Sequence, residues 1–167
     1  MIEVKEFSLF NGVDKEYLDG FVQGCTSKRI EKGAALFNKG DVGDGMYVLT
    51  SGKLEVLLDD EESSVAVLEE GAFLGEISLL VKGERNATVR AVEDSVVSFF
   101  DSQNFQNRIS TDDPQALKIV CNMAIVLARR LRETDAFISK LSNEGAHPEK
   151  IREISDFKKK LIAEYDF

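Results

Sequence analysis

The hydrophobic positions of the chain follow two different periods. From Ser27 to Asp101 they come in short runs separated by glycines, which is typical of short strands joined by tight turns. From Asp112 onwards they recur at alternating steps of three and four, which is the spacing of one face of a long helix. This pattern predicts a mainly β fold with flanking helices, an eight-stranded antiparallel β roll (a double-stranded jelly roll) followed by a long C-terminal helix. The expected strands include Ala35–Phe37, Met46–Leu49, Leu54–Leu58, Val65–Leu68, Ala87–Val92 and Val96–Phe100.

The order of these patterns predicts one domain and a tail. We expect a domain of residues 1–141, with the β roll at about 27–101 and the long helix at about 112–141. Before the roll, Asp14 is suited to cap a helix over Lys15–Gly24, whose apolar stripe would pack on the core. After a break at Ser142–Pro148, residues 142–167 are expected to form an amphipathic helical tail.

The long helix carries two apolar stripes. Since a helix that is wetted on one side needs only one, the second stripe predicts a homodimer, with one stripe on the β roll and the other on a second copy. The alternative is one wide stripe that packs entirely on its own domain. The proposed dimer seam consists of Leu117, Val120, Ala124, Leu127, Leu131, Thr134, Ile138 and Leu141, and the second stripe of Ile119, Met123, Val126 and Phe137.

One short run has the chemistry of a sugar-phosphate site. Gly75 permits a tight turn, and the segment Glu76–Leu80 is long enough for one helical turn, whose first N–H groups favour an anion. Arg85 follows ten residues after Gly75 and offers a forked cation that suits phosphate. Glu76 can accept from hydroxyl groups. The alternative is a surface turn with an incidental arginine.

At these residues the chain resembles a known family. Gly75–Leu80 and Arg85–Val89 resemble the phosphate-binding cassette of cyclic nucleotide-binding domains, which occur in cyclic AMP receptor transcription factors, protein kinase A regulatory subunits and cyclic nucleotide-gated channels. The resemblance implies that Glu76 binds the ribose 2′-hydroxyl and Arg85 the cyclic phosphate. It also implies that Gly75 and backbone N–H groups around Ile77, Ser78 and Ala87 complete the phosphate cradle. We expect Arg85 to be unpaired without ligand, so that its removal changes ligand-free stability little.

The resemblance extends upstream, and it extends into the long helix, where Ala128–Thr134 resembles the dimerisation helix of cyclic AMP receptor-like regulators. Gly33–Tyr47 and Val48–Val56 are similar to the family's turn-rich opening, where we expect Asp41 and Asp44 to bond their own backbone in tight corners. A calcium site over Asp41–Asp44 is the alternative, but the further ligands of an EF-hand are absent.

The identity of the base rests on two positions. In the family, a threonine that matches Thr134 reaches the adenine, which favours cyclic AMP here. The family's residue after the cassette arginine is alanine for cyclic AMP and threonine for cyclic GMP, whereas Asn86 is neither. The expected ligand is therefore cyclic AMP, with cyclic GMP left open.

The composition of the chain and the motifs that it lacks argue against a DNA-binding protein, an enzyme and a membrane protein. A net charge of -9 argues against DNA binding, and no helix-turn-helix segment follows the long helix. One histidine, His147, and two widely spaced cysteines, Cys25 and Cys121, provide neither a metal cluster nor a nucleophile–base set, so we expect no enzyme. Without a signal peptide or an apolar run of membrane length, the expected location is the cytoplasm. The leading hypothesis is a cyclic nucleotide sensor that signals to a separate effector; the alternative is a structural dimerisation module of the same fold that binds no nucleotide.

Overall fold

The structure, a computed structural model, describes residues 7–57, 64–80 and 83–143. The chain forms two compact units, Met1–Ala124 and Ile125–Phe167. The strands are β1 (Thr26–Ile30), β2 (Ala35–Phe37), β3 (Gly45–Ser51), β4 (Leu54–Leu57), β5 (Ser64–Leu68), β6 (Phe73–Leu74), β7 (Thr88–Ala91) and β8 (Ser95–Asp101). The helices are the 3-10 turn η2 (Ser8–Phe10), α1 (Lys15–Gln23), α2 (Glu76–Leu80), α3 (Ser102–Ser110) and α4 (Pro114–Asn143). The acidic hairpin tip lies largely outside the described residues, and the tail helix lies wholly outside them.

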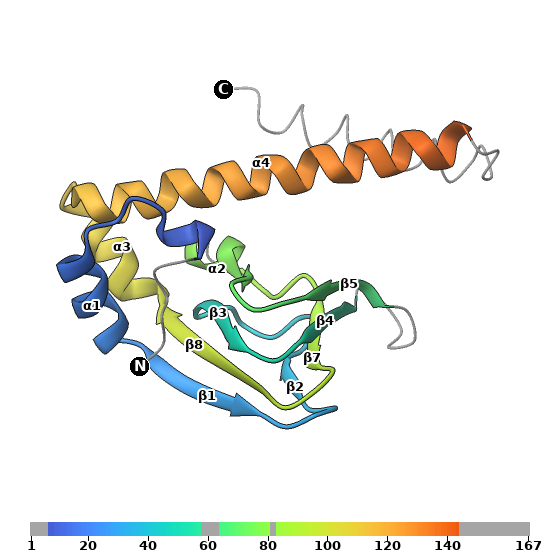
Figure 1. The fold of residues 1–167 in the computed structure, drawn as a ribbon, viewed down its shortest axis with the longest axis horizontal. Coiled ribbons are helices and arrows are strands. Elements are labelled where there is room, and N and C mark those ends of the chain that lie inside the picture. Colours follow the sequence, from blue (N-terminus) through green and yellow to red (C-terminus); the bar gives the residue numbers. More distant parts are fainter. Residues whose placement is uncertain (1–6, 58–63, 81–82, 144–167) are drawn as a thin grey trace. The chain divides into compact units, whose positions relative to one another are not determined.

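The described strands form two four-stranded sheets. Their orders are β1-β8-β3-β6 and β2-β7-β4-β5, and every pairing is antiparallel. Figure 1 shows the two sheets facing each other as a roll, with β8 between β1 and β3. The expected eight-stranded antiparallel roll with a long C-terminal helix is confirmed.

The interior of the roll is filled by side chains from both sheets. Leu49 and Val97 from one sheet share this core with Leu54 and Val89 from the other, and all four are at most 2% exposed. Phe37, Tyr47 and Phe99 continue this core as a row of aromatic rings, with centroids 5.9 and 5.0 Å apart. This aromatic end of the core is the one that reaches the cassette.

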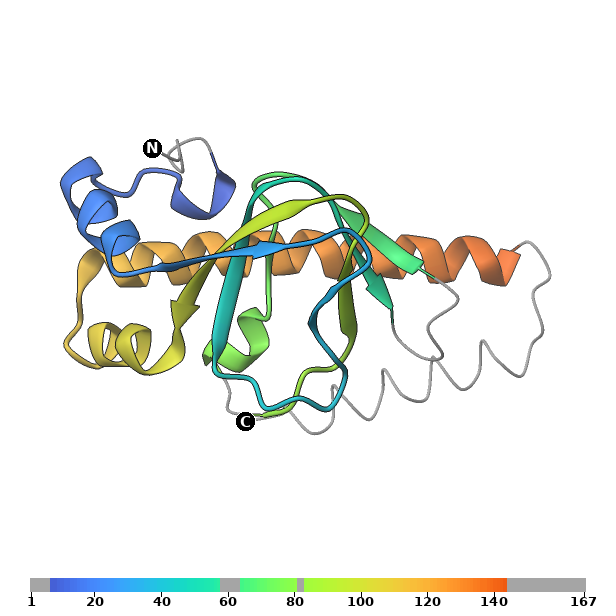
Figure 2. The same cartoon turned by 90° about the horizontal axis from the view of Figure 1, so that it is seen from below.

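A second core joins the outer face of the first sheet to the helices. Phe100 of β8 contacts Phe10 and Phe21, and Phe21 in turn contacts Phe105 of α3. Figure 2 shows α1 and α3 at the same end of the roll. The stripe predicted for the first helix therefore does pack on the core, with Leu18 2% and Phe21 8% exposed.

Polar side chains fix the start of α4 to the N-terminal segment. Asp14 occupies the cap position of α1, but its carboxylate accepts from the Gln115 amide instead of capping the helix, which corrects the sequence-based expectation. The backbone N–H of Asp14 donates to the same Gln115 side chain over 3.0 Å. The Asn122 amide donates to the backbone oxygens of Leu9 and Asn11, both over 2.9 Å.

The two stripes of α4 have different surroundings. Asp113 caps the helix, because its carboxylate accepts from the backbone N–H groups of Gln115 and Ala116. Ile119 and Met123 are fully buried, so the second stripe begins in the core of the β-roll unit. In contrast, the seam positions Leu117 and Leu131 are 39% and 60% exposed. Among the described residues, no helix has an apolar stretch long enough to cross a bilayer.

Candidate functional site

The cassette begins with a turn that only glycine fits. Gly75 follows β6 with a φ of +75°, a left-handed conformation that residues with a side chain rarely adopt. A Cβ atom at this position would lie 2.2 Å from Nη1 of Arg85, so the glycine also makes room for the arginine. The turn leads directly into the single helical turn α2, which confirms the predicted local structure.

Arg85 is buried at the centre of this region. It is 4% exposed, and its Nη1 donates to the backbone oxygens of Gly45 over 2.8 Å and Gly75 over 3.3 Å. Its Nη2 donates to Oδ1 of Asp44 over 3.1 Å, and this contact is also an ion pair. The side chain of Asp44 is 66% exposed, so a solvated carboxylate faces a buried guanidinium. The prediction that Arg85 is unpaired in the absence of ligand is therefore wrong.

Two aromatic rings lie beside the guanidinium. The Cζ atom of Arg85 is 4.5 Å from the ring centroid of Phe37 and 5.5 Å from that of Tyr47. Both distances are within the range of cation–π attraction. Burial raises the pKa of Tyr47 above its ordinary value, and the nearby negative charge of Asp44 adds to this effect. Tyr47 therefore stays a neutral phenol beside the cation at neutral pH.

The backbone of Arg85 is held by the loop that precedes β3. Arg85 donates its N–H to the backbone oxygen of Asp41 over 2.8 Å, and its own oxygen accepts from Gly40 over 2.9 Å. Nearby, Gly43 donates to the backbone oxygen of Gly83 over 2.9 Å. These bonds fix residues 40–43 and residues 83–85 against each other, although the two segments are distant in sequence. They also place the Asp44 carboxylate next to the guanidinium of Arg85.

The other predicted cassette residues divide into buried and exposed positions. Glu76 and Ser78 are 8% and 4% exposed, and a Cβ atom at Gly43 would overlap the Ser78 side chain, so the loop lies directly on α2. Ile77 is 51% exposed, and Asn86 is also exposed. Ala87 is half-buried. The structure thus brings Gly75, Ser78 and Arg85 into one region with the loop before β3.

Thr134 lies in the other compact unit. Its hydroxyl donates to the backbone oxygen of Arg130, one helical turn earlier, over 2.9 Å, and its side chain is exposed. The contact with adenine that the resemblance implies for Thr134 stays a prediction.

The site residue that sequence reasoning missed is Asp44. Asp41 does what we predicted, since its carboxylate accepts from the backbone N–H of Asn38 over 2.7 Å. Asp44 instead pairs with Arg85, which corrects the expectation that it serves a turn. The spacing of the two aspartates could not distinguish them, because the pairing joins residues that are 41 positions apart.

The arrangement can bind an anion. Among the residues that the structure describes, the guanidinium of Arg85 donates to two neutral carbonyl oxygens and to the carboxylate of Asp44, which is exposed. A phosphate oxygen that replaced Asp44 would find a buried forked donor and the first N–H groups of α2. Within the described ranges, no group of three or more histidine, cysteine or acidic side chains could hold a metal ion, so the calcium alternative has no support there.

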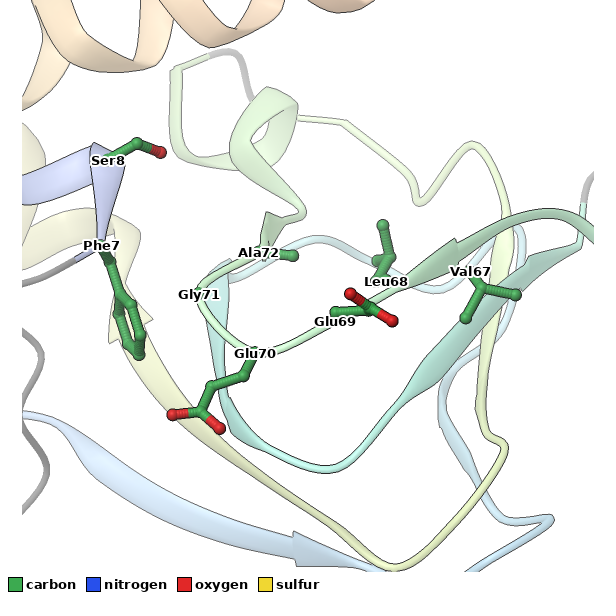
Figure 3. Close-up of a pocket in the computed structure, with 8 residues that line it drawn as sticks. All are labelled: Phe7, Ser8, Val67, Leu68, Glu69, Glu70, Gly71 and Ala72. Atoms are coloured by element: carbon green, nitrogen blue, oxygen red, sulfur yellow. The ribbon is translucent and has the colours of Figure 1, made fainter.

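A separate groove lies outside the cassette. It has a volume of about 520 Å³ and is lined by Phe7, Ser8 and residues 67–72. Figure 3 shows these residues, with Phe7 and Ser8 on the left and Val67 and Leu68 on the right. It contains none of the predicted ligand-binding residues.

Comparison with known proteins agrees with this geometry. The family model for the cyclic nucleotide-binding domain matches residues 27–112. The Cyclic AMP receptor protein of Thermus thermophilus is 34% identical over 147 residues, which are 86% of this chain and 66% of that protein. The cAMP-dependent protein kinase regulatory subunit of Yarrowia lipolytica is 31% identical over 103 residues, 62% of this chain and 28% of that subunit. The crystal structure of the Thermus thermophilus Catabolite Activator Protein superposes with a TM-score of 0.69 at 31% identity, covering 81% of this chain and 63% of that one.

The chain spans slightly less than two thirds of the receptor protein and under a third of the kinase subunit. The matched residues 27–112 contain the strands β2 to β8, all of β1 except Thr26, and both parts of the cassette, Gly75–Leu80 and Arg85–Val89. With its roll, its glycine turn and its buried arginine, this chain belongs to the cyclic nucleotide-binding domain family.

Proposed function

We propose that this protein is a cyclic nucleotide sensor that binds cyclic AMP at the cassette. The observation that carries the proposal is the buried guanidinium of Arg85, which lies at the Gly75 turn and forms its ion pair with the exposed carboxylate of Asp44. Arg85 would bind the cyclic phosphate, and the backbone N–H groups of Ile77, Ser78 and Ala87 would complete the phosphate cradle. Glu76 would accept from the ribose 2′-hydroxyl. Cyclic GMP is the competing ligand, because Asn86 does not indicate the base.

The output of the sensor would pass through α4. Bound nucleotide would favour one arrangement of α4 over others, with Thr134 reaching the adenine, and this population shift would be transmitted to an effector. We propose that the protein acts as a homodimer through Leu117, Val120, Ala124, Leu127, Leu131 and Ile138. The exposure of Leu117 and Leu131 supports this proposal. We further propose that the protein acts without catalysing a reaction, without binding DNA, and in the cytoplasm.

One observation favours a second candidate, a structural module that binds no nucleotide. Without ligand, Arg85 already has three hydrogen-bond contacts and two ring contacts, so it can stabilise the fold when no nucleotide is bound. The two candidates predict different responses to nucleotide.

A thermal-shift titration with cyclic AMP, cyclic GMP and 5′-AMP separates them. Because a ligand that binds only the folded state stabilises it by mass action, the sensor should melt at higher temperature as cyclic nucleotide is added, in a concentration-dependent way. The non-cyclic nucleotide 5′-AMP serves as the control. An unchanged melting temperature at millimolar cyclic nucleotide would support the structural module.

A further inference from the structure

The rings of Phe37 and Tyr47 have contacts that core packing alone does not require. Phe37 is half-buried at the end of the roll interior, and its ring centroid is 5.9 Å from that of Tyr47. Both rings lie within 5.5 Å of the guanidinium carbon of Arg85, with Phe37 the closer at 4.5 Å. The guanidinium therefore lies against an aromatic surface on the side of the core.

The aromatic surface helps to explain how a charged guanidinium is stabilised in the interior, because its hydrogen bonds alone do not fully compensate the cost of burial. Burying a guanidinium is costly unless its charge is compensated, and the carbonyl oxygens of Gly45 and Gly75 carry no net charge. The compensating carboxylate of Asp44 is mostly in solvent, and it is the acceptor that a phosphate would displace. After that displacement, the rings and the two carbonyl groups are the contacts that remain to orient Arg85.

We propose that Phe37, together with Tyr47, is a positioning residue of the phosphate subsite: the two rings hold the planar guanidinium of Arg85 at the cassette and thereby set the affinity for the cyclic phosphate. An arginine stacks on an aromatic face more readily than a lysine, because its guanidinium is planar and weakly hydrated. The inference rests on the proposed function for its ligand, but the contact that it assigns exists in the ligand-free protein.

The simpler interpretation is that Phe37 only fills the core. Under that interpretation, Phe37→Leu would lower stability, and it would do so to the same extent whatever residue occupies position 85. A double-mutant cycle separates the two interpretations, because residues that act on each other are not additive. Phe99→Leu is the matched control, since Phe99 is also half-buried and contacts Tyr47 at 5.0 Å.

The first measurement uses ligand-free protein. Urea unfolding is compared for the parent, Phe37→Leu, Arg85→Met and the double variant, with Phe99→Leu tested in the same way. We expect the double variant to lose less stability than the sum of its single changes, whereas Phe99→Leu and Arg85→Met should be additive. Additive losses for Phe37 and Arg85 would overturn the assigned contact, whether or not any nucleotide binds.

The second measurement is calorimetric titration with cyclic AMP. Phe37→Leu should weaken binding roughly five- to tenfold, and Phe37→Tyr, which keeps the ring, should restore most of it. In an Arg85→Lys background the effect of Phe37→Leu should shrink. If the parent binds cyclic AMP and Phe37→Leu binds it equally well, the positioning role is wrong while the sensor function stands. If the parent does not bind, the sensor function and the positioning role both fail, and the unfolding cycle still decides whether the rings hold Arg85.

Discussion

Nη2 of Arg85 donates to Oδ1 of Asp44 over 3.1 Å, so the cation that is predicted to bind a phosphate already carries an acidic partner in the ligand-free protein. The pair is asymmetric, because the arginine side chain is 3% exposed and the aspartate side chain 66%. A partner that is mostly solvated can be exchanged for a ligand, whereas the buried arginine is retained. This relationship leads to two predictions about stability and affinity.

Replacing Arg85 should destabilise the ligand-free protein. Arg85→Ala removes the donors to the buried carbonyl oxygen of Gly45 and the partly buried one of Gly75, which we expect to cost about 1–3 kcal/mol. Urea unfolding without nucleotide measures this loss. Arg29→Ala, at an exposed position of β1, is the control and should change the free energy of unfolding little. A loss for Arg85→Ala no greater than that of the control would mean that these hydrogen bonds do not stabilise the fold.

Neutralising Asp44 should strengthen nucleotide binding. In Asp44→Asn the side-chain oxygen can still accept from Arg85, but the negative charge that would repel and compete with a phosphate is gone. Since exposed ion pairs are worth about 0–1 kcal/mol, we expect affinity for cyclic AMP to rise about two- to threefold. Asp41→Asn makes the same charge change in the same loop without touching the guanidinium. Equal effects of the two substitutions in calorimetric titration would assign the gain to net charge alone.

Whether a feature of the site could be predicted from the sequence depends on how far apart along the chain its interacting residues are. The Gly75 turn and the helical turn α2 are local, so their residue types indicated them correctly. The pairing of Asp44 with Arg85 and the contact of Phe37 with Arg85 join distant segments, and nothing in the spacing of either segment encodes them.

The same limit applies to the fold. Six of the eight described strands were predicted from their apolar runs, whereas β1 was not, because four of its five residues are exposed and its sequence has no apolar pattern. The strand β6 was not predicted either, because Phe73 and Leu74 are buried but form a run of two residues, too short to show the period of a strand. The helix α3 was missed for a similar reason, since Phe105 is its only buried residue. Asp14 was expected to cap α1, but a partner 101 positions away takes its carboxylate.

A charge in the exposed seam of α4 should prevent dimerisation. Leu131 is 60% exposed in a single chain, so Leu131→Glu should leave the isolated chain folded while placing a charge in the proposed dimer interface. Analytical ultracentrifugation at tens of micromolar should show a dimer for the parent and a monomer for the variant. Arg132→Glu, one position off the seam, is the control and should remain a dimer. A parent protein that is monomeric under these conditions would contradict the seam.

The two cysteines should differ in reactivity. Burial raises the pKa of Cys25 to about 12, and its thiol donates to the backbone oxygen of Phe21, whereas Cys121 is exposed. At pH 8 a thiol reagent should modify Cys121 rapidly and Cys25 only after unfolding, because the thiolate is the reactive form. Cys121→Ser should therefore show almost no fast reaction. Rapid modification of this variant would mean that Cys25 is accessible.

The raised pKa of Cys25 also predicts that the stability of the protein depends on pH. Since the folded state raises the pKa of Cys25 above the ordinary value of 9.0, it holds the thiol proton more tightly than the unfolded chain does. The contribution of Cys25 to stability should be complete below about pH 9 and should decrease as the pH rises towards 12. Chemical unfolding at pH 8 and pH 10 should show a smaller decrease for Cys25→Ala than for the parent. An identical decrease would contradict the assigned burial.

Calorimetric titration of the parent and Arg85→Ala with cyclic AMP tests the central claim most directly. Charge-assisted hydrogen bonds from a buried guanidinium to a phosphate are worth roughly 1.5–3 kcal/mol each, so removing this side chain should weaken binding at least about a hundredfold. Circular dichroism at the titration temperature confirms that the variant is folded. We predict measurable binding of cyclic AMP by the parent and its near loss in Arg85→Ala. Equal affinity in the two proteins would contradict a phosphate site at Arg85.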